Sequence, residues 1–186
     1  MFKKQRSTVI TLITVICAFY LWELVDSSII DTLALGSFDY LKYSNEWYRL
    51  FSVALMHNTS STLPFHLAFN MMALHQLGTP LEQAFGKAKF LVIFFFSLLA
   101  GSITSALLMA PTGYSIGVSG AVFGLFGAFI ALGNRIGAEV KSIYVIIAIN
   151  FAIGFTVGGV DWHAHLGGLI GGWIITKVLL GLNASK

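Results

Sequence analysis

Residues 117–133 have the sequence GVSGAVFGLFGAFIALG, in which a Gly-x-Ser-Gly motif opens an apolar stretch. Ser119 stands at the head of this stretch, and His165 opens another apolar stretch 46 residues later. Ionisable side chains are costly to place among apolar residues, and within membrane spans they usually face the bundle interior or water. This pairing of a nucleophile-type serine with a base-type histidine is therefore the first candidate for a functional site.

The composition places the chain among membrane proteins. Of its 186 residues, 56% are hydrophobic and only 10% are charged, whereas a soluble domain has about 25% charged residues. This leaves too little polar material to cover a surface in water, which predicts a single integral membrane domain over residues 1–186. Cys17 is the one cysteine, so an internal disulfide and a cysteine-based zinc cluster are excluded.

Six apolar stretches predict an all-α polytopic membrane protein with six transmembrane helices. They cover residues 8–25, 63–81, 89–110, 119–133, 142–158 and 163–181. A helix needs about 20 residues to cross the hydrocarbon layer, and the fourth stretch has only 15. Either this helix is tilted, or it begins below the surface after an inward-dipping segment at 111–118, which must then be shielded by protein or line a wet cavity.

The lysine and arginine residues predict that both termini lie in the cytoplasm. With six alternating spans, nine of these residues fall inside and two outside. The inside set is Lys3, Lys4, Arg6, Lys87, Lys89, Arg135, Lys141, Lys177 and Lys186, and the outside set is Lys42 and Arg49. Residues 1–7 then form a short cytoplasmic tail. No small-x-small cleavage site follows the first apolar stretch, so we expect an uncleaved signal anchor.

Segment 26–62, between the first two stretches, is predicted to be a long external loop. It mixes charges with the aromatic residues Phe38, Tyr40, Tyr43, Trp47, Tyr48 and Phe51. Such a mixture is typical of a segment that lies in the lipid headgroup layer. The alternative is an ordinary disordered loop, which the density of aromatic residues disfavours.

Polar residues converge because the second, fourth and sixth spans all run from the outside inward. Their first turns carry His66 and Asn70, one turn apart, then Ser119, and then His165. A histidine that takes the serine proton makes the hydroxyl a nucleophile. Taken alone, Ser119 has the position of a helix N-cap and His165 that of an interfacial or packing residue. Their convergence from separate helices favours a catalytic site.

Small residues predict that the fourth and sixth helices touch. Gly120, Gly124 and Ala128 recur at every fourth position of one helix, and Ala164, Gly168 and Gly172 do so on the other. Such stripes let two backbones approach closely in lipid. Gly117 and Gly120 flank the serine and leave its hydroxyl unscreened. Phe123, one turn after Ser119, is placed to stack on the His165 ring and hold it.

Negative charge that develops on a substrate oxygen requires preorganised N–H donors. The candidates are the His66 ring, the Asn70 amide and the backbone N–H of Ser119 at a helix N-terminus. The alternative for the first two is a structural hydrogen-bonded pair within the second span. Asp161, four residues before His165, is predicted to be a surface loop residue, which leaves a Ser–His dyad. No His-Glu-x-x-His sequence occurs, and no metal site is predicted.

Three motifs, in order, resemble those of the rhomboid family of intramembrane serine proteases. His66-Leu67-Ala68-Phe69-Asn70 resembles the family's His-x-x-x-Asn, Gly117-Val118-Ser119-Gly120 its Gly-x-Ser-Gly, and Ala164-His165-Leu166-Gly167-Gly168 its Ala-His-x-x-Gly. Trp47-Tyr48-Arg49 is similar to the Trp-Arg element of the family's first loop. The likeness covers nearly the whole chain, in the minimal six-span form.

The resemblance implies a six-helix rhomboid bundle with Ser119 and His165 as catalytic dyad and His66, Asn70 and the Ser119 amide as oxyanion hole. It also implies a lateral gate and cap formed by the fifth span and residues 155–162. Substrates would be transmembrane segments of other proteins, cleaved near the outer face of a bacterial inner membrane. Membrane lipids would surround the protein, and neither a cofactor nor a nucleic-acid partner is implied.

The chain departs from the family pattern at two places. Phe123 stands where the family often has Tyr, and His57 precedes His66 by nine residues where many bacterial relatives have five, which indicates an insertion at 58–63.

Two other functions are alternatives to proteolysis. The first is a catalytically silent rhomboid-like module that binds transmembrane helices, but such a module has no need of the retained Ser, His and Asn. A channel or transporter needs polar residues in the inner leaflet, where the second, fourth and sixth spans are apolar and glycine-rich.

Overall fold

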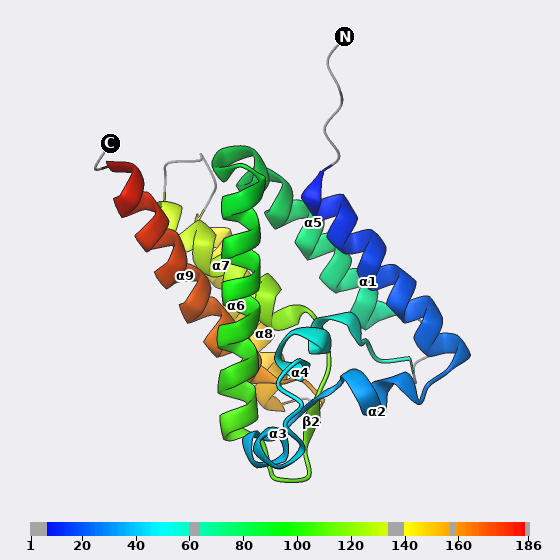
Figure 1. Ribbon diagram of the computed structural model, residues 1–186. Helices are drawn as coiled ribbons and strands as arrows, with labels where there is room; N and C mark the ends of the chain where they lie inside the picture. The colour runs from blue at the N-terminus through cyan, green and yellow to red at the C-terminus, as the bar shows by residue number, and fades with distance from the viewer. Residues whose placement is uncertain (1–6, 60–63, 134–139, 157–158, 185–186) are drawn as a thin grey trace.

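The computed structural model describes residues 7–59, 64–133, 140–156 and 159–184 (Figure 1). Its long helices follow the predicted stretches: α1 (Thr8–Val25), α5 (Phe65–Phe85), α6 (Lys87–Leu108), α7 (Ser119–Leu132), α8 (Val140–Thr156) and α9 (Trp162–Ala184). Within the described ranges, α1, α6 and residues Trp162–Leu182 of α9 are long and apolar enough to cross a membrane. The chain thus forms the expected apolar helical bundle, whereas the count of six spans stays a prediction.

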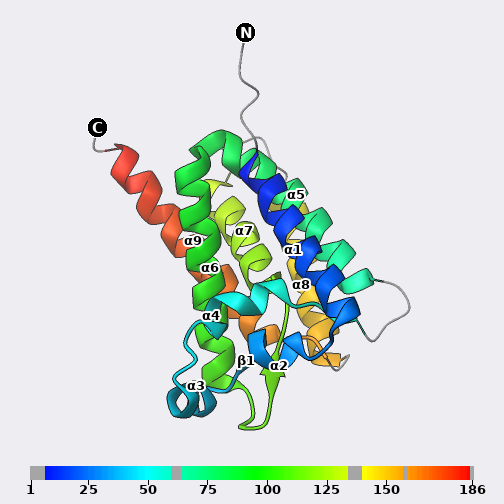
Figure 2. The same ribbon diagram turned by 45° about the vertical axis from the view of Figure 1, so that its right-hand side comes forward.

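The predicted site residues lie towards one end of this bundle. Figures 1 and 2 show the first turn of α1 and the last turn of α9 at the same end of the molecule. Helices α5, α7 and α9 begin towards the opposite end, where the chain between α1 and α5 also folds. The first turns of these three helices carry His66, Ser119 and His165, so all three residues lie on the same side of the bundle.

Helix α7 lies at the centre of the bundle and is the most enclosed helix. Nearly all of its residues are buried, and its neighbours are α5, α6, α8 and α9. The end of the segment before it is shielded as well, because Val118 is fully buried and the Gly117 N–H donates to the Val53 carbonyl at 2.9 Å. This shielding meets the requirement of the alternative in which the helix begins below the surface, whereas the choice between that alternative and a tilted helix stays a prediction.

Helix α5 continues past the predicted end at residue 81 to Phe85, and Glu82 lies in this additional turn. The Glu82 carboxylate accepts the Ser7 hydroxyl at 2.8 Å and the backbone N–H groups of Thr8 and Val9 at 2.8 and 3.2 Å. These N–H groups belong to the first turn of α1, which has no acceptors within its own helix. A carboxylate there is also favoured by the helix dipole. Glu82 therefore joins the end of α5 to the start of α1.

The chain between α1 and α5 is ordered over residues 26–59, so the disordered alternative is wrong. It contains α2 (Ile29–Leu33), β1 (Leu35–Gly36), α3 (Phe38–Ser44), α4 (Arg49–Ser52) and the 3₁₀ turn η1 (Val53–Leu55). Strand β1 pairs antiparallel with β2 (Tyr114–Ser115), which ties this segment to the chain before α7. Residues 60–63, which are four of the six residues of the predicted insertion at 58–63, lie outside the described residues. A place in the headgroup layer stays a prediction.

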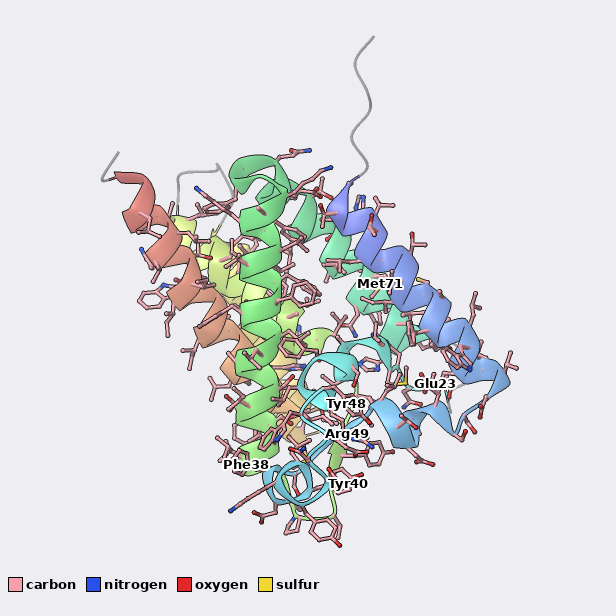
Figure 3. All side chains as sticks on the ribbon, in the orientation of Figure 1. Glu23, Phe38, Tyr40, Tyr48, Arg49 and Met71 are labelled. Carbon is pink, nitrogen blue, oxygen red and sulfur yellow. The ribbon has the colours of Figure 1, made fainter. Side chains whose placement is uncertain are left out.

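Arg49 is a buried residue that forms several hydrogen bonds inside the segment between α1 and α5 (Figure 3). Its side chain is only 5% exposed and donates to the carbonyls of Ala34 and Asp31, both at 2.7 Å. The guanidinium also pairs with Glu46 at 2.8 Å and lies over the Tyr40 ring. The hydrogen bonds from Arg49 and then Tyr40 hold the pKa of the Glu46 carboxyl below its usual range. One buried cation therefore connects residues 31–34, Tyr40 and Glu46.

We predict that Arg49→Lys loosens this segment. A lysine ammonium cannot reproduce the planar fork that reaches two carbonyls and a carboxylate at once, so the free energy of unfolding should fall by about 2 kcal/mol. Limited proteolysis should then cut within residues 26–59 at least several-fold faster. Lys42→Ala, at an exposed position of the same segment, is the control and should change neither quantity. Equal cleavage rates for both variants would contradict the role given to Arg49.

Candidate active site

Ser119 is the first residue of α7, and Val118 occupies the N-cap position. The serine hydroxyl does not cap its own helix; its Oγ lies 2.9 Å from Nε2 of His165, which is hydrogen-bond distance. Gly117 turns the chain into α7 with a φ of 117°, a left-handed conformation that residues with side chains rarely adopt. The geometry therefore matches the predicted serine–imidazole pair and not the predicted cap.

His165 lies in the first turn of α9 and is 5% exposed. The Phe123 ring stacks on its imidazole with centroids 4.0 Å apart and an angle of 6° between the planes. Phe151 of α8 meets the same imidazole edge-on at 6.5 Å. Among the described residues, the other ring nitrogen, Nδ1, has no hydrogen-bond partner. Aromatic packing, and not an acidic side chain, therefore orients this imidazole.

The pair meets because the backbones of α7 and α9 touch. A Cβ placed on Gly168 would lie 1.9 Å from the carbonyl oxygen of Gly120, and one on Gly172 would lie 2.0 Å from that of Gly124. Both are far inside van der Waals contact, so a side chain at either position would push the helices apart. The small-residue stripes that the sequence contains thus bring α7 and α9 as close as backbones can pack.

Asp161 corrects one expectation, because it is not a plain surface loop residue. Its Oδ2 accepts the hydroxyls of Ser105 at 2.5 Å and Ser115 at 2.6 Å, and its Oδ1 accepts the backbone N–H of Ala164 at 3.1 Å. It therefore caps α9 and links that helix to α6 and β2. The described contacts of its carboxylate do not include the His165 ring. A dyad without a third acid remains the simpler hypothesis.

The two residues from α5 differ in their relation to Ser119. A Cβ on Gly117 would lie 3.1 Å from His66 Nε2 and 3.8 Å from Ser119 Oγ, so the imidazole and the hydroxyl face the same glycine. Asn70 is 7% exposed, and its Nδ2 donates to the His66 carbonyl at 2.8 Å. This bond is the structural one that the sequence left open, and it uses one of the two amide hydrogens.

Sequence reasoning missed a buried polar pair beside these residues. Glu23 at the end of α1 is 2% exposed, and His57, just before α5, is not exposed at all. The His57 backbone N–H donates to Glu23 Oε2 at 3.1 Å, and the His57 ring lies 5.1 Å from that of His66. The one available signal was an acid inside the last turn of an apolar helix, which resembles a charge flanking the membrane.

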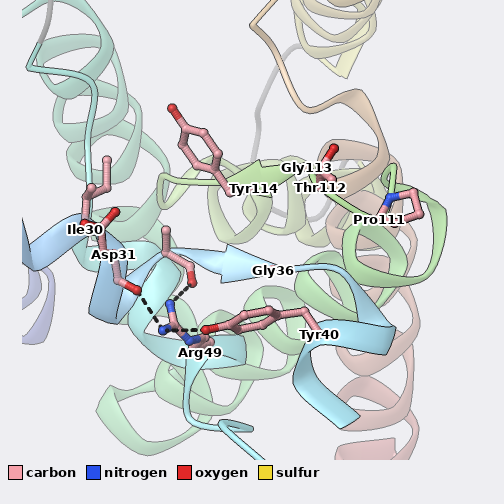
Figure 4. A pocket seen from close by; sticks show the side chains of 10 residues that line it. Ile30, Asp31, Gly36, Tyr40, Arg49, Pro111, Thr112, Gly113 and Tyr114 are labelled. Atoms are coloured by element: carbon pink, nitrogen blue, oxygen red, sulfur yellow. Dashed lines mark hydrogen bonds between the residues drawn. The ribbon is translucent and has the colours of Figure 1, made fainter. Parts of the chain in front are cut away.

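A cavity of about 360 Å³ opens elsewhere, against the paired strands β1 and β2. Figure 4 shows Ile30, Asp31, Tyr40, Arg49 and Tyr114 around it. Its lining contains none of the predicted catalytic residues, so it is distinct from the Ser119–His165 pair. Among the described residues, no three His, Cys, Asp or Glu side chains gather as metal ligands. A metal-free and cofactor-free site stays a prediction.

A helical membrane bundle that encloses a hydrogen-bonded serine and histidine defines the general class of the protein. Its family follows from comparison with known proteins, in which a family model for the Rhomboid domain matches residues 44–182. The chain belongs to the rhomboid family, which confirms the resemblance of its three motifs. Family and apolar helices together identify an integral membrane protein.

Three relatives give the extent of the similarity. Rhomboid protease GluP of Bacillus subtilis (strain 168) is 40% identical over 139 residues, 72% of this chain and 26% of GluP. RHOMBOID-like protein 1 of Arabidopsis thaliana is 36% identical over 146 residues, 74% of this chain and 36% of that protein. Putative rhomboid protease YdcA of Bacillus subtilis (strain 168) is 33% identical over 139 residues, 72% and 67% of the two chains. The chain thus spans about a quarter to two thirds of these relatives.

Proposed function

We propose that this chain is an intramembrane serine endopeptidase that cleaves transmembrane segments of other proteins. The observation that carries the proposal is the distance of 2.9 Å between Ser119 Oγ and His165 Nε2. A hydroxyl and an imidazole at this distance are the minimal parts of nucleophilic acyl transfer. Similarity to proteins named rhomboid proteases supports the same reaction.

The proposed reaction has two halves. In the first, His165 Nε2 takes the Ser119 proton as the oxygen attacks the substrate carbonyl carbon, and the tetrahedral intermediate carries the negative charge on the former carbonyl oxygen. His165 then gives the proton to the departing amine, which leaves an acyl-enzyme. In the second half, water attacks the acyl carbon and loses a proton to His165. The Ser119 oxygen departs and recovers that proton, which releases a carboxylic acid.

The negatively charged oxygen requires donors on the side of the site formed by α5. We assign this role to the His66 ring, the Asn70 amide and the backbone N–H of Ser119. The nearness of His66 Nε2 to the Gly117 position supports the assignment of the His66 ring. The assignment of the Ser119 N–H is supported by its place in the first turn of α7, because N–H groups in the first turn of a helix have no acceptor within that helix. Asn70 is the least supported donor, since its described bond lies within α5.

We further propose a single six-span domain with both termini in the cytoplasm of a bacterial cell and residues 26–62 outside the inner membrane. The common end of the first turn of α1 and the last turn of α9 supports this arrangement (Figure 1). Substrate would enter beside α8, whose residues Tyr144, Ile146 and Ile149 are about half exposed. Residues 157–158 of the proposed gate lie outside the described residues.

We predict that a fluorophosphonate probe labels the protein covalently at Ser119. The probe reacts only with a serine activated by a base. Because a general base contributes about 10²–10⁴-fold, His165→Ala should slow labelling by about that factor. The rate of labelling in detergent, followed by in-gel fluorescence and peptide mapping, measures both effects.

His163→Ala is the matched control for that experiment. His163 lies in the same turn of α9 but pairs with Asp161 at 3.6 Å, so its loss should leave the labelling rate within about twofold. Labelling that is equally fast without His165 would refute its assignment as the base. Label found on a serine other than Ser119 would refute the nucleophile.

A further inference from the structure

Glu23 occupies a position that is unfavourable for a carboxylate. It lies in the last turn of α1 (Figure 3), where the helix dipole disfavours negative charge. It is only 2% exposed. Burial of an acid without strong partners costs free energy. Its described partners both come from the chain just before α5: the backbone N–H of His57 at 3.1 Å and the side chain of Thr59. The carboxylate therefore fixes residues 57–59, which we call the pre-α5 segment.

The pre-α5 segment in turn contacts the His66 ring. The backbone N–H of Asn58 donates to His66 Nδ1 at 3.4 Å. A neutral imidazole has one nitrogen that accepts and one that carries hydrogen. Because Nδ1 accepts, the hydrogen must be on Nε2, the nitrogen that lies beside Gly117 on the side of the glycine where the Ser119 hydroxyl is also near. The segment thus selects the tautomer that an oxyanion donor requires.

The His57 side chain completes the support of that ring. It is fully buried, and its ring lies 5.1 Å from the His66 ring at an angle of 48°. Burial, together with the neighbouring His66, lowers the pKa of His57 to about 3. His57 is therefore neutral near pH 7 and restricts the His66 ring by contact, without placing a second cation beside it.

We propose that Glu23 is a positioning residue: by holding the pre-α5 segment, it keeps the His66 N–H directed at the oxygen that becomes negatively charged. The inference rests on the proposed function and extends it to a residue of α1 that does not touch the substrate. A donor that acts only on the transition state changes kcat and leaves KM nearly unaltered. Loosening it should therefore have that kinetic signature.

The first test compares Glu23→Leu with Glu23→Gln. Leucine removes the acceptor for the His57 N–H, whereas glutamine retains an oxygen at the same place. Complete loss of one oxyanion donor costs about 10²–10³-fold in kcat, so partial misplacement in Glu23→Leu should cost about tenfold at constant KM. Glu23→Gln should stay within about threefold of the parent protein. Ile16→Ala, a buried change on the same helix, controls for lower stability and should not alter kcat of the folded protein.

The second test reads the tautomer directly and needs no turnover. The five histidines are labelled with ¹⁵N, and the His66 signals are assigned by their absence from His66→Gln. The parent protein should show hydrogen on Nε2, as should Ser119→Ala. Glu23→Leu should show a mixture of tautomers. Asn58→Pro, which removes the N–H at an exposed position, should do the same even if Glu23→Leu does not fold, and Asn58→Ala, which keeps the N–H, should not.

The outcomes separate this inference from the proposed function. A mixed tautomer together with a lower kcat in Glu23→Leu or Asn58→Pro supports the positioning role. Hydrogen on Nδ1 in the parent protein, or variants in which the tautomer and kcat do not change together, would overturn it. If the parent protein cleaves no transmembrane substrate, the proposed function fails, and the tautomer of the Ser119→Ala protein still reports on the contact between the pre-α5 segment and His66.

Discussion

Ser119→Ala is expected to abolish cleavage of a transmembrane substrate and to leave the fold intact. Loss of the nucleophile in serine proteases lowers kcat by about 10⁴–10⁶-fold, because the remaining groups have nothing to activate. The substitution removes one oxygen and the bond to His165 at 2.9 Å, so the free energy of unfolding should change by about 1 kcal/mol or less. The measurement is the rate at which protein in liposomes cleaves a fluorogenic single-span substrate, with thermal unfolding in parallel.

The matched control for this prediction is Ser97→Ala. Ser97 is a fully buried serine whose hydroxyl donates to the Ile93 carbonyl within α6 at 2.6 Å. Its loss should leave cleavage within about twofold. More than about 1% residual cleavage in Ser119→Ala, in a preparation free of other proteases, would refute the nucleophile. A parent protein that binds the substrate and never cuts it would instead indicate the catalytically silent module.

The pairing of Ser119 with His165 was predictable because its causes are local in sequence. Apolar stretches locate the helices, alternation sets which helix ends are neighbours, and glycine stripes four residues apart determine which helices can touch. The position of Phe123 one turn after Ser119 follows from helix geometry, and its ring does stack on His165. These features need no knowledge of how distant loops fold.

The polar supports of the site were not predictable, because their partners are far apart in sequence. Asp161 bonds to hydroxyls 56 and 46 residues away, and Glu23 to a backbone N–H 34 residues away. The sequence around a single acidic residue near the end of an apolar stretch is the same whether its carboxylate faces water or a buried N–H. The hydrogen bonds that Arg49 makes inside its loop were not predictable for the same reason, because their acceptors include backbone carbonyl oxygens, which every residue has.

Gly168→Ala is expected to damage both the fold and the site, although it adds only one methyl group. The new carbon would lie 1.9 Å from the Gly120 carbonyl oxygen and 2.7 Å from the Gly120 carbonyl carbon. These are backbone atoms of a helix that is itself buried, so no side chain can rotate away. Overpacking costs about 1–3 kcal/mol where side chains can adjust, and here we expect a loss of about 3 kcal/mol or more in the free energy of unfolding.

The same methyl group should slow the chemistry of the protein that still folds. Gly168 lies one turn after His165 on α9, and Gly120 follows Ser119 on α7, so separating these glycines separates the reacting groups. A misplacement of about 1 Å can cost about 10²-fold in rate, which fluorophosphonate labelling of the folded fraction would measure. Gly181→Ala, on the same helix but with open space around the new carbon, should keep full activity and be neutral or slightly stabilising. Equal stability and labelling in the two variants would mean that α7 and α9 do not touch at Gly168, and the serine and imidazole would then need another cause for their contact.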